Sequence, residues 1–104
     1  MMSDNLKVLL VDDESMVRMS ITSFAKKANI ELDTASNGLE AIKKVKANTY
    51  NLVLMDIYMP EMDGKKATAE IKALPVGSDL KIVAISAGKF FSIIFLTYVS
   101  FNTI

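Results

Sequence analysis

The fold of this chain is decided by residues 52–60, which read LVLMDIYMP. Four apolar residues run directly into one carboxylate, Asp56, and Pro60 ends the segment four positions later. A short apolar run bounded by turn residues is typical of a strand that is buried on both faces of a parallel sheet. Asp56 then falls at the carboxyl end of that strand, where open α/β sheets bind their ligands. A lone Asp at this place more often just opens a turn or caps a helix.

An earlier part of the chain repeats the pattern. Residues 6–11 (LKVLLV) form a second apolar run, and three acids follow it, Asp12, Asp13 and Glu14. If the two strands are neighbours, Asp12, Asp13 and Asp56 meet in one crevice. Neighbouring carboxylates repel one another unless a cation joins them, and hard oxygen ligands beside an open crevice suit Mg²⁺. The alternative, in which the first acids only complement the dipole of the next helix, is disfavoured because Asp56 supplies a matching acid.

The rest of the chain alternates between helical and extended patterns. Ser15 is expected to cap the first helix and Asn29 to end it, and residues 31–35 form a weakly apolar strand that suits a sheet edge. Residues 81–85 (KIVAI) predict a fourth strand. The order β-α-β-α-β-α-β predicts a parallel sheet with helices on both faces. The inward-facing helix residues are expected to be Val17, Ile21, Phe24 and Ala28, then Ala41, Ile42 and Val45, then Ala67, Ile71 and Leu74.

Composition excludes several classes of function. A length of 104 residues indicates one domain, and twelve basic residues cancel twelve acidic ones, so no net charge argues for nucleic acid or an anionic membrane as partner. The chain has no Cys and no His, which excludes disulfides, thiolate nucleophiles, histidine bases and Cys/His metal sites. The first residues lack the basic region of a signal peptide, so a cytoplasmic location is expected, with a nuclear one as the alternative.

Three blocks of this sequence carry a resemblance to a known family. Residues 8–14 (VLLVDDE), residues 52–64 (LVLMDIYMPEMDG) and residues 82–87 (IVAISA) resemble the receiver domain of two-component response regulators. The resemblance extends from residue 6 to about residue 88, and its middle block is highly specific. It implies a flavodoxin-like α/β fold, a three-layer sandwich with strand order 2-1-3-4-5.

The resemblance also implies a chemical role for the acids. Asp56 would be the phosphoacceptor, taking a phosphoryl group from a histidine kinase or a histidine phosphotransfer protein. Asp13 would bind Mg²⁺ together with Asp56 and the main-chain carbonyl of Tyr58, and Asp12 would support the metal through water.

The same resemblance assigns the end of the fourth predicted strand. Ser86 would be the switch hydroxyl that turns inward to bond the phosphoryl group, with the backbone amide of Ala87 nearby. A phosphoryl group adds about −1.5 to −2 charge, and a hydroxyl at a strand end can respond to it by turning inward. The alternative for Ser86 is an ordinary turn serine.

The chain departs from the family after about residue 88. A receiver continues with a helix, a fifth strand that ends in Lys followed by Pro, and a last helix, whereas Lys89 is the only basic residue after Ser86 here and stands too early. We expect a receiver core in residues 1–88 and an atypical apolar tail in residues 89–104, for which a substitute fifth strand, a disordered segment and an oligomerisation patch are the alternatives. The sequence is therefore interpreted as C-terminally truncated or divergent.

These observations leave three hypotheses. The first is a phosphoaccepting receiver module of a phosphorelay, which is a substrate of phosphoryl transfer and not an enzyme. The second is a binding-only or decoy receiver that phosphorylates poorly because the fifth-strand lysine is missing. The third, a Mg²⁺-dependent phosphohydrolase with Asp56 as nucleophile, is disfavoured because Tyr58 stands where a general acid would be needed.

Overall fold

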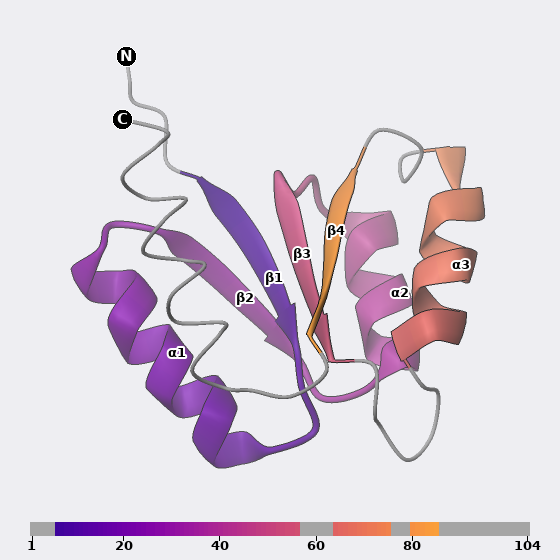
Figure 1. Ribbon diagram of the computed structural model, residues 1–104. Helices are drawn as coiled ribbons and strands as arrows, with labels where there is room; N and C mark the ends of the chain where they lie inside the picture. Colours follow the sequence, from indigo (N-terminus) through magenta and orange to yellow (C-terminus); the bar gives the residue numbers. More distant parts are fainter. Residues whose placement is uncertain (1–5, 57–63, 76–79, 86–104) are drawn as a thin grey trace.

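The computed structural model describes residues 6–56, 64–75 and 80–85 of the chain. In these parts strands and helices alternate as the sequence predicts (Figure 1). The elements are, in chain order, β1 (Lys7–Val11), α1 (Ser15–Lys27), β2 (Glu31–Ala35), α2 (Gly38–Ala47), β3 (Leu52–Asp56), α3 (Gly64–Ala73) and β4 (Lys81–Ile85).

The four strands form one parallel sheet in the order β2-β1-β3-β4. Helix α1 lies on one face of this sheet, and α2 and α3 lie together on the other (Figure 1). Strand β2 is at an edge of the described sheet, as its weak apolar pattern predicts. The three-layer α/β prediction is therefore confirmed, and the order of the four strands is the one implied by the resemblance.

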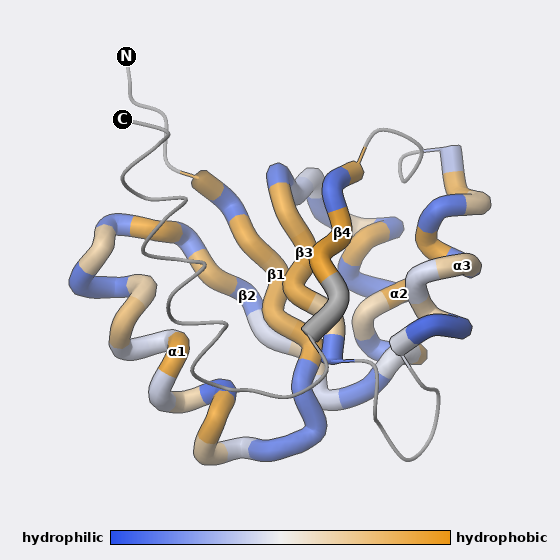
Figure 2. The backbone as a smooth tube through the Cα atoms, viewed as in Figure 1, coloured by the Kyte–Doolittle hydropathy of each residue, from blue (hydrophilic) through white to orange (hydrophobic). Residues whose placement is uncertain are grey.

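Alternating residues of the two central strands supply both halves of the core. Leu9 and Val11 of β1 pack with α2 and α3, whereas Val8 and Leu10 pack beneath α1. Strand β3 alternates in the same way, and all four of these β1 residues are 0% exposed. Because both faces of the sheet are covered, both strands are apolar almost throughout, which Figure 2 shows as hydrophobic tubes in the centre of the sheet.

The predicted inner faces of the helices are confirmed. The buried members are Ile21, Ala41, Val45, Ala67 and Ile71. The others are partly buried and pack against the same two clusters: Val17, Phe24, Ala28, Ile42 and Leu74.

The predicted cap of the first helix is wrong by one residue. The N-cap is Glu14, with extended backbone angles, and Ser15 is the first helical residue. The carboxylate of Asp12 accepts a hydrogen bond from the backbone amide of Glu14 at 2.9 Å, so Asp12 orders the entry to the helix and no serine cap is needed. The predicted end of this helix agrees with the structure: α1 stops at Lys27, and Asn29 adopts the left-handed conformation (φ 62°) that often follows a helix.

Residues 89–104, for which an apolar tail and a substitute fifth strand are predicted, lie outside the described residues. Within the described ranges, none of the helices has the length and apolar character needed to cross a membrane.

Polar contacts at the carboxyl end of β2 fix the start of α2. The side chain of Asn37 caps the helix by accepting a hydrogen bond from the backbone amide of Glu40. The Glu40 carboxylate in turn accepts hydrogen bonds from the backbone amide and the hydroxyl of Ser36, both at 2.8 Å. Lys44 pairs with Glu40 at 3.9 Å and donates to the main-chain oxygen of Thr34, so the edge strand and α2 are joined.

These contacts make Glu40 a source of acid-sensitive stability. The hydrogen bonds from the Ser36 amide and hydroxyl, helped by the charge of Lys44, lower the pKa of Glu40 from its usual 4.5 in spite of partial burial. A carboxylate whose pKa is lower in the folded state stabilises the fold above its unfolded pKa, and this stabilisation is lost as the pH falls through the folded value.

We therefore predict that Glu40→Gln reduces the pH dependence of stability. In urea unfolding followed by circular dichroism, the unfolding free energy of the wild type should fall more between neutral and acidic pH than that of Glu40→Gln. The matched control is Glu70→Gln, in an exposed position of α3, which should retain the wild-type dependence. Equal pH dependence of the unfolding free energy in the wild type and Glu40→Gln would contradict the assignment of acid-sensitive stability to Glu40.

Candidate functional site

The register between the two central strands places two acids side by side. Strands β1 and β3 pair in parallel with Val11 opposite Met55, and the next residue on each strand is an aspartate, Asp12 or Asp56. The chain leaves β1 toward β2 on one side and returns to β3 on the other, so this is the point where the strand order reverses. In open α/β sheets such a point is where ligands bind.

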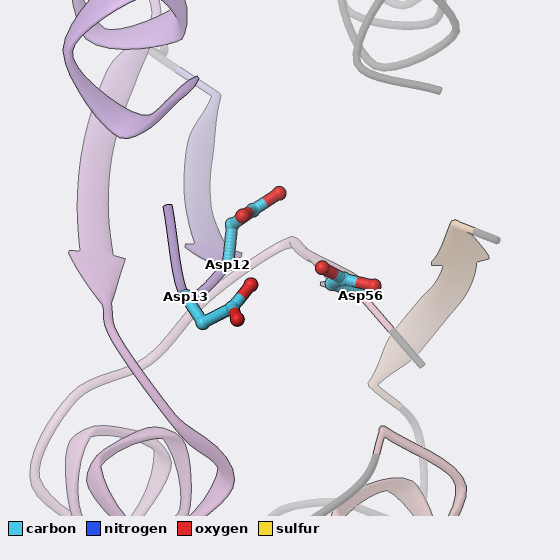
Figure 3. A group of neighbouring side chains, drawn as sticks. All are labelled: Asp12, Asp13 and Asp56. Carbon is cyan, nitrogen blue, oxygen red and sulfur yellow. The ribbon is translucent and has the colours of Figure 1, made fainter. Parts of the chain in front are cut away.

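Three carboxylates gather here, as the sequence predicts. One carboxylate oxygen from each of Asp12, Asp13 and Asp56 lies within 4.8 Å of the other two. Asp12 and Asp56 are 2% and 6% exposed, whereas Asp13 is exposed to solvent. Figure 3 shows the group at the ends of β1 and β3. The site therefore has a buried wall and an open side.

The donor set fits a hard divalent cation. All three groups offer carboxylate oxygen, which Mg²⁺ prefers, and Mg²⁺ commonly binds through one or two carboxylates while keeping water and phosphate ligands. The exposed side at Asp13 leaves room for such ligands. Without a cation, two buried acids and a third within 4.8 Å repel one another, so the arrangement favours a positively charged ligand.

Backbone and side-chain hydrogen bonds hold Asp12 in place. Its backbone amide donates to the main-chain oxygen of Ala35 at 3.0 Å, which ties it to β2. Its carboxylate accepts from the amide of Glu14, and its main-chain oxygen accepts from Nη1 of Arg18 at 2.7 Å.

The contact from Arg18 was not predicted from the sequence. Its only signal is a basic residue one turn into the helix that follows the acids. Side chains on a helix lean toward its N-terminus, so Arg18 reaches back over the first turn to Asp12, which precedes the N-cap Glu14 in the chain.

The remaining predicted site residues are not placed. Tyr58 follows β3, and Ser86 and Ala87 follow β4 directly, but all three lie outside the described residues. Their positions in the sequence put them after the carboxyl ends of strands that flank the acidic group. Their roles stay predictions.

Comparisons with known proteins agree with this geometry. A family model described as the response regulator receiver domain matches residues 8–95. The chemotaxis protein CheY of Listeria monocytogenes is 45% identical over 69 residues, which cover 65% of this chain and 58% of that protein. Several other curated relatives are much longer: the chain spans 7%, 18% and 13% of the length of three of them.

Solved structures with the same fold include a metal complex and a complex with a kinase. The response regulator TrrA of Thermotoga maritima, solved with Mg²⁺ and BeF, has a TM-score of 0.73 and 32% identity, covering 89% of this chain and 79% of that one. A chain from the complex of histidine kinase ThkA with TrrA has a TM-score of 0.72 and 36% identity, covering 79% and 69%.

The family model spans most of the chain, including Asp12, Asp13 and Asp56. Three independent structural observations support the same family. They are the parallel sheet, its strand order, and the acidic group at the point where the strand order reverses. The chain belongs to the response regulator receiver domain family.

Proposed function

We propose that this chain is a phosphoaccepting receiver module of a phosphorelay, in which Asp56 takes a phosphoryl group from a histidine kinase or a histidine phosphotransfer protein with the help of Mg²⁺. The observation that carries the proposal is the convergence of Asp12, Asp13 and Asp56 within 4.8 Å at the carboxyl end of the sheet. Membership of the receiver family supports it, as do the relatives named histidine kinases and response regulators.

The transfer is a nucleophilic displacement at phosphorus. A carboxylate oxygen of Asp56 attacks the phosphorus atom and forms a P–O bond, while the bond between phosphorus and the donor's imidazole nitrogen breaks and the donor keeps the electron pair. The product is an aspartyl phosphate. A bound Mg²⁺ supplies positive charge for the phosphoryl oxygens. The chain is then a substrate of transfer and not an enzyme.

Each acid has a separate task in this proposal. Asp13 and Asp56 would bind the metal directly, and Asp12, which is held by the hydrogen bonds described above, would support it through water. The main-chain carbonyl of Tyr58 would complete the protein ligands. Ser86 would bond the phosphoryl group beside the amide of Ala87.

The partner would dock beside the acids, against the start of α1. Two methionines of this helix, Met16 and Met19, are 78% and 69% exposed. They stand in the first two turns of the helix that follows the acidic residues, so a partner that covers them brings its own phosphohistidine close to the site. That the chain binds neither nucleic acid nor a membrane, and that it works in the cytoplasm or nucleus, stay predictions.

A phosphorylation-deficient, binding-only receiver is the second candidate. It is favoured by one sequence feature: within residues 86–104 the only basic residue is Lys89, which stands earlier than the lysine that neutralises the phosphoryl group in the resembled family. Such a chain would keep the acidic group and its affinity for a divalent cation but would not carry a phosphoryl group.

We predict that the chain incubated with acetyl phosphate and Mg²⁺ gains the mass of one phosphoryl group, and that Asp56→Asn gains none. Intact-mass spectrometry makes the measurement, and omission of Mg²⁺ should abolish the gain. Asp33→Asn, the same acid-to-amide change within β2, is the matched control and should gain the phosphoryl group. No gain in a wild type that is folded by circular dichroism would contradict the first candidate and favour the second.

We also predict that Mg²⁺ stabilises the wild type. A ligand that binds only the folded state at a hundred times its Kd adds about 2.7 kcal/mol to the unfolding free energy. Asp13→Asn removes a ligand and a repelling charge, so this variant should be at least as stable as the wild type without Mg²⁺ and gain little when it is added. Urea unfolding with and without MgCl₂ measures both effects. A Mg²⁺ effect of equal size in the two proteins would contradict the placement of the metal.

A further inference from the structure

Arg18 reaches the acidic site through the backbone and not through a carboxylate. Its Nη1 donates to the main-chain oxygen of Asp12 at 2.7 Å, and its side chain is half-buried. Between Arg18 and the carboxylates of Asp12 and Asp13, the structure records no ion pair among the described residues. The guanidinium therefore contacts the main chain of the segment that carries these carboxylates.

The oxygen that Arg18 holds belongs to the peptide group between Asp12 and Asp13. A peptide group is planar, so an anchor on its oxygen also fixes the direction in which the chain enters Asp13. This direction matters because Asp13 is the exposed member of the acidic group.

The other two anchors of Asp12 act elsewhere. The hydrogen bond from its amide to Ala35 fixes the side that faces β2, and the hydrogen bond from Glu14 to its carboxylate fixes the side chain. The second of these closes a ring that includes the Asp12–Asp13 peptide, and Nη1 of Arg18 adds a hydrogen bond to the oxygen of that peptide.

We propose that Arg18 is a positioning residue that raises the affinity of the site for Mg²⁺ by holding the Asp12–Asp13 peptide in the orientation that points Asp13 at the cation. This inference rests on the metal site of the proposed function. It deepens that function, because it assigns a role in metal binding to a residue that contacts neither metal nor phosphoryl group. Partners that orient the ligands of a metal typically change its affinity about 10- to 100-fold when they are replaced.

The direction in which the Kd for Mg²⁺ changes when Arg18 is replaced distinguishes a positioning role from an effect of its charge. Arg18 is a cation close to three acids, so its electric field alone opposes the binding of another cation. If charge were its whole effect, loss of Arg18 would make Mg²⁺ bind more tightly. If Arg18 positions Asp13, its loss makes Mg²⁺ bind more weakly in spite of the favourable change in charge.

The experiment is a titration of the full chain with MgCl₂, followed by the backbone amide signals in ¹⁵N-resolved NMR spectra, which also report whether each variant is folded. We expect the Kd for Mg²⁺ to rise about tenfold in Arg18→Gln. Lys43→Gln, an exposed position of α2 that loses the same charge, is the matched control and should keep the wild-type Kd.

A second variant, Arg18→Lys, covers the case in which Arg18→Gln does not fold. Lysine keeps the charge but offers a single donor group on a flexible stem in place of the planar guanidinium, so its Kd should lie between those of the wild type and Arg18→Gln. A Kd at or below the wild-type value in every folded Arg18 variant would overturn the positioning role of Arg18 but would leave the proposed metal site intact. Failure of the folded wild type to bind Mg²⁺ would overturn the proposed metal site as well.

Discussion

The pairing of β1 with β3 is the constraint on which the site depends. Parallel strands lie about 4.8 Å apart, so the register that sets Val11 opposite Met55 makes Asp12 and Asp56 neighbours whatever their side chains prefer. Alternating core residues hold this register, because a shift by one residue would turn every buried side chain of a strand to the opposite face. The hydrophobic core therefore positions the acids, although none of its members contributes to their chemistry.

Gathering three acids at one end of the sheet has an electrostatic cost, and the fold offsets part of it. Each helix follows a strand, so the N-termini of α1 and α2 lie at the same end of the sheet as the acids, and the positive ends of their dipoles face that way. The amide of Glu14 and the guanidinium of Arg18 add donors around Asp12. These groups stabilise the acids and are compatible with the cation and the phosphoryl group of the proposed function.

Much of this arrangement could be predicted from the sequence, for identifiable reasons. Strands that are covered on both faces are recognisable in the sequence as continuous apolar runs, even without periodicity. An acid at the end of such a run marks the edge of the sheet where ligands bind. The grouping of Asp12, Asp13 and Asp56 was therefore predictable. The contact from Arg18 and the cap at Glu14 were not, because both depend on the direction of single backbone groups, which residue patterns do not encode. Tyr58, Ser86 and Ala87 stay predictions that rest on the resemblance.

A crystal structure of the chain with Mn²⁺ in place of Mg²⁺ tests most directly whether the ends of β1 and β3 form one site for a divalent cation beside Asp56. Anomalous scattering identifies the position of Mn²⁺ without reference to the protein ligands. We expect one strong anomalous peak at bonding distance from carboxylate oxygens of Asp13 and Asp56. A peak elsewhere on the surface, or none at the ends of β1 and β3 in a crystal that contains the ion, would contradict it.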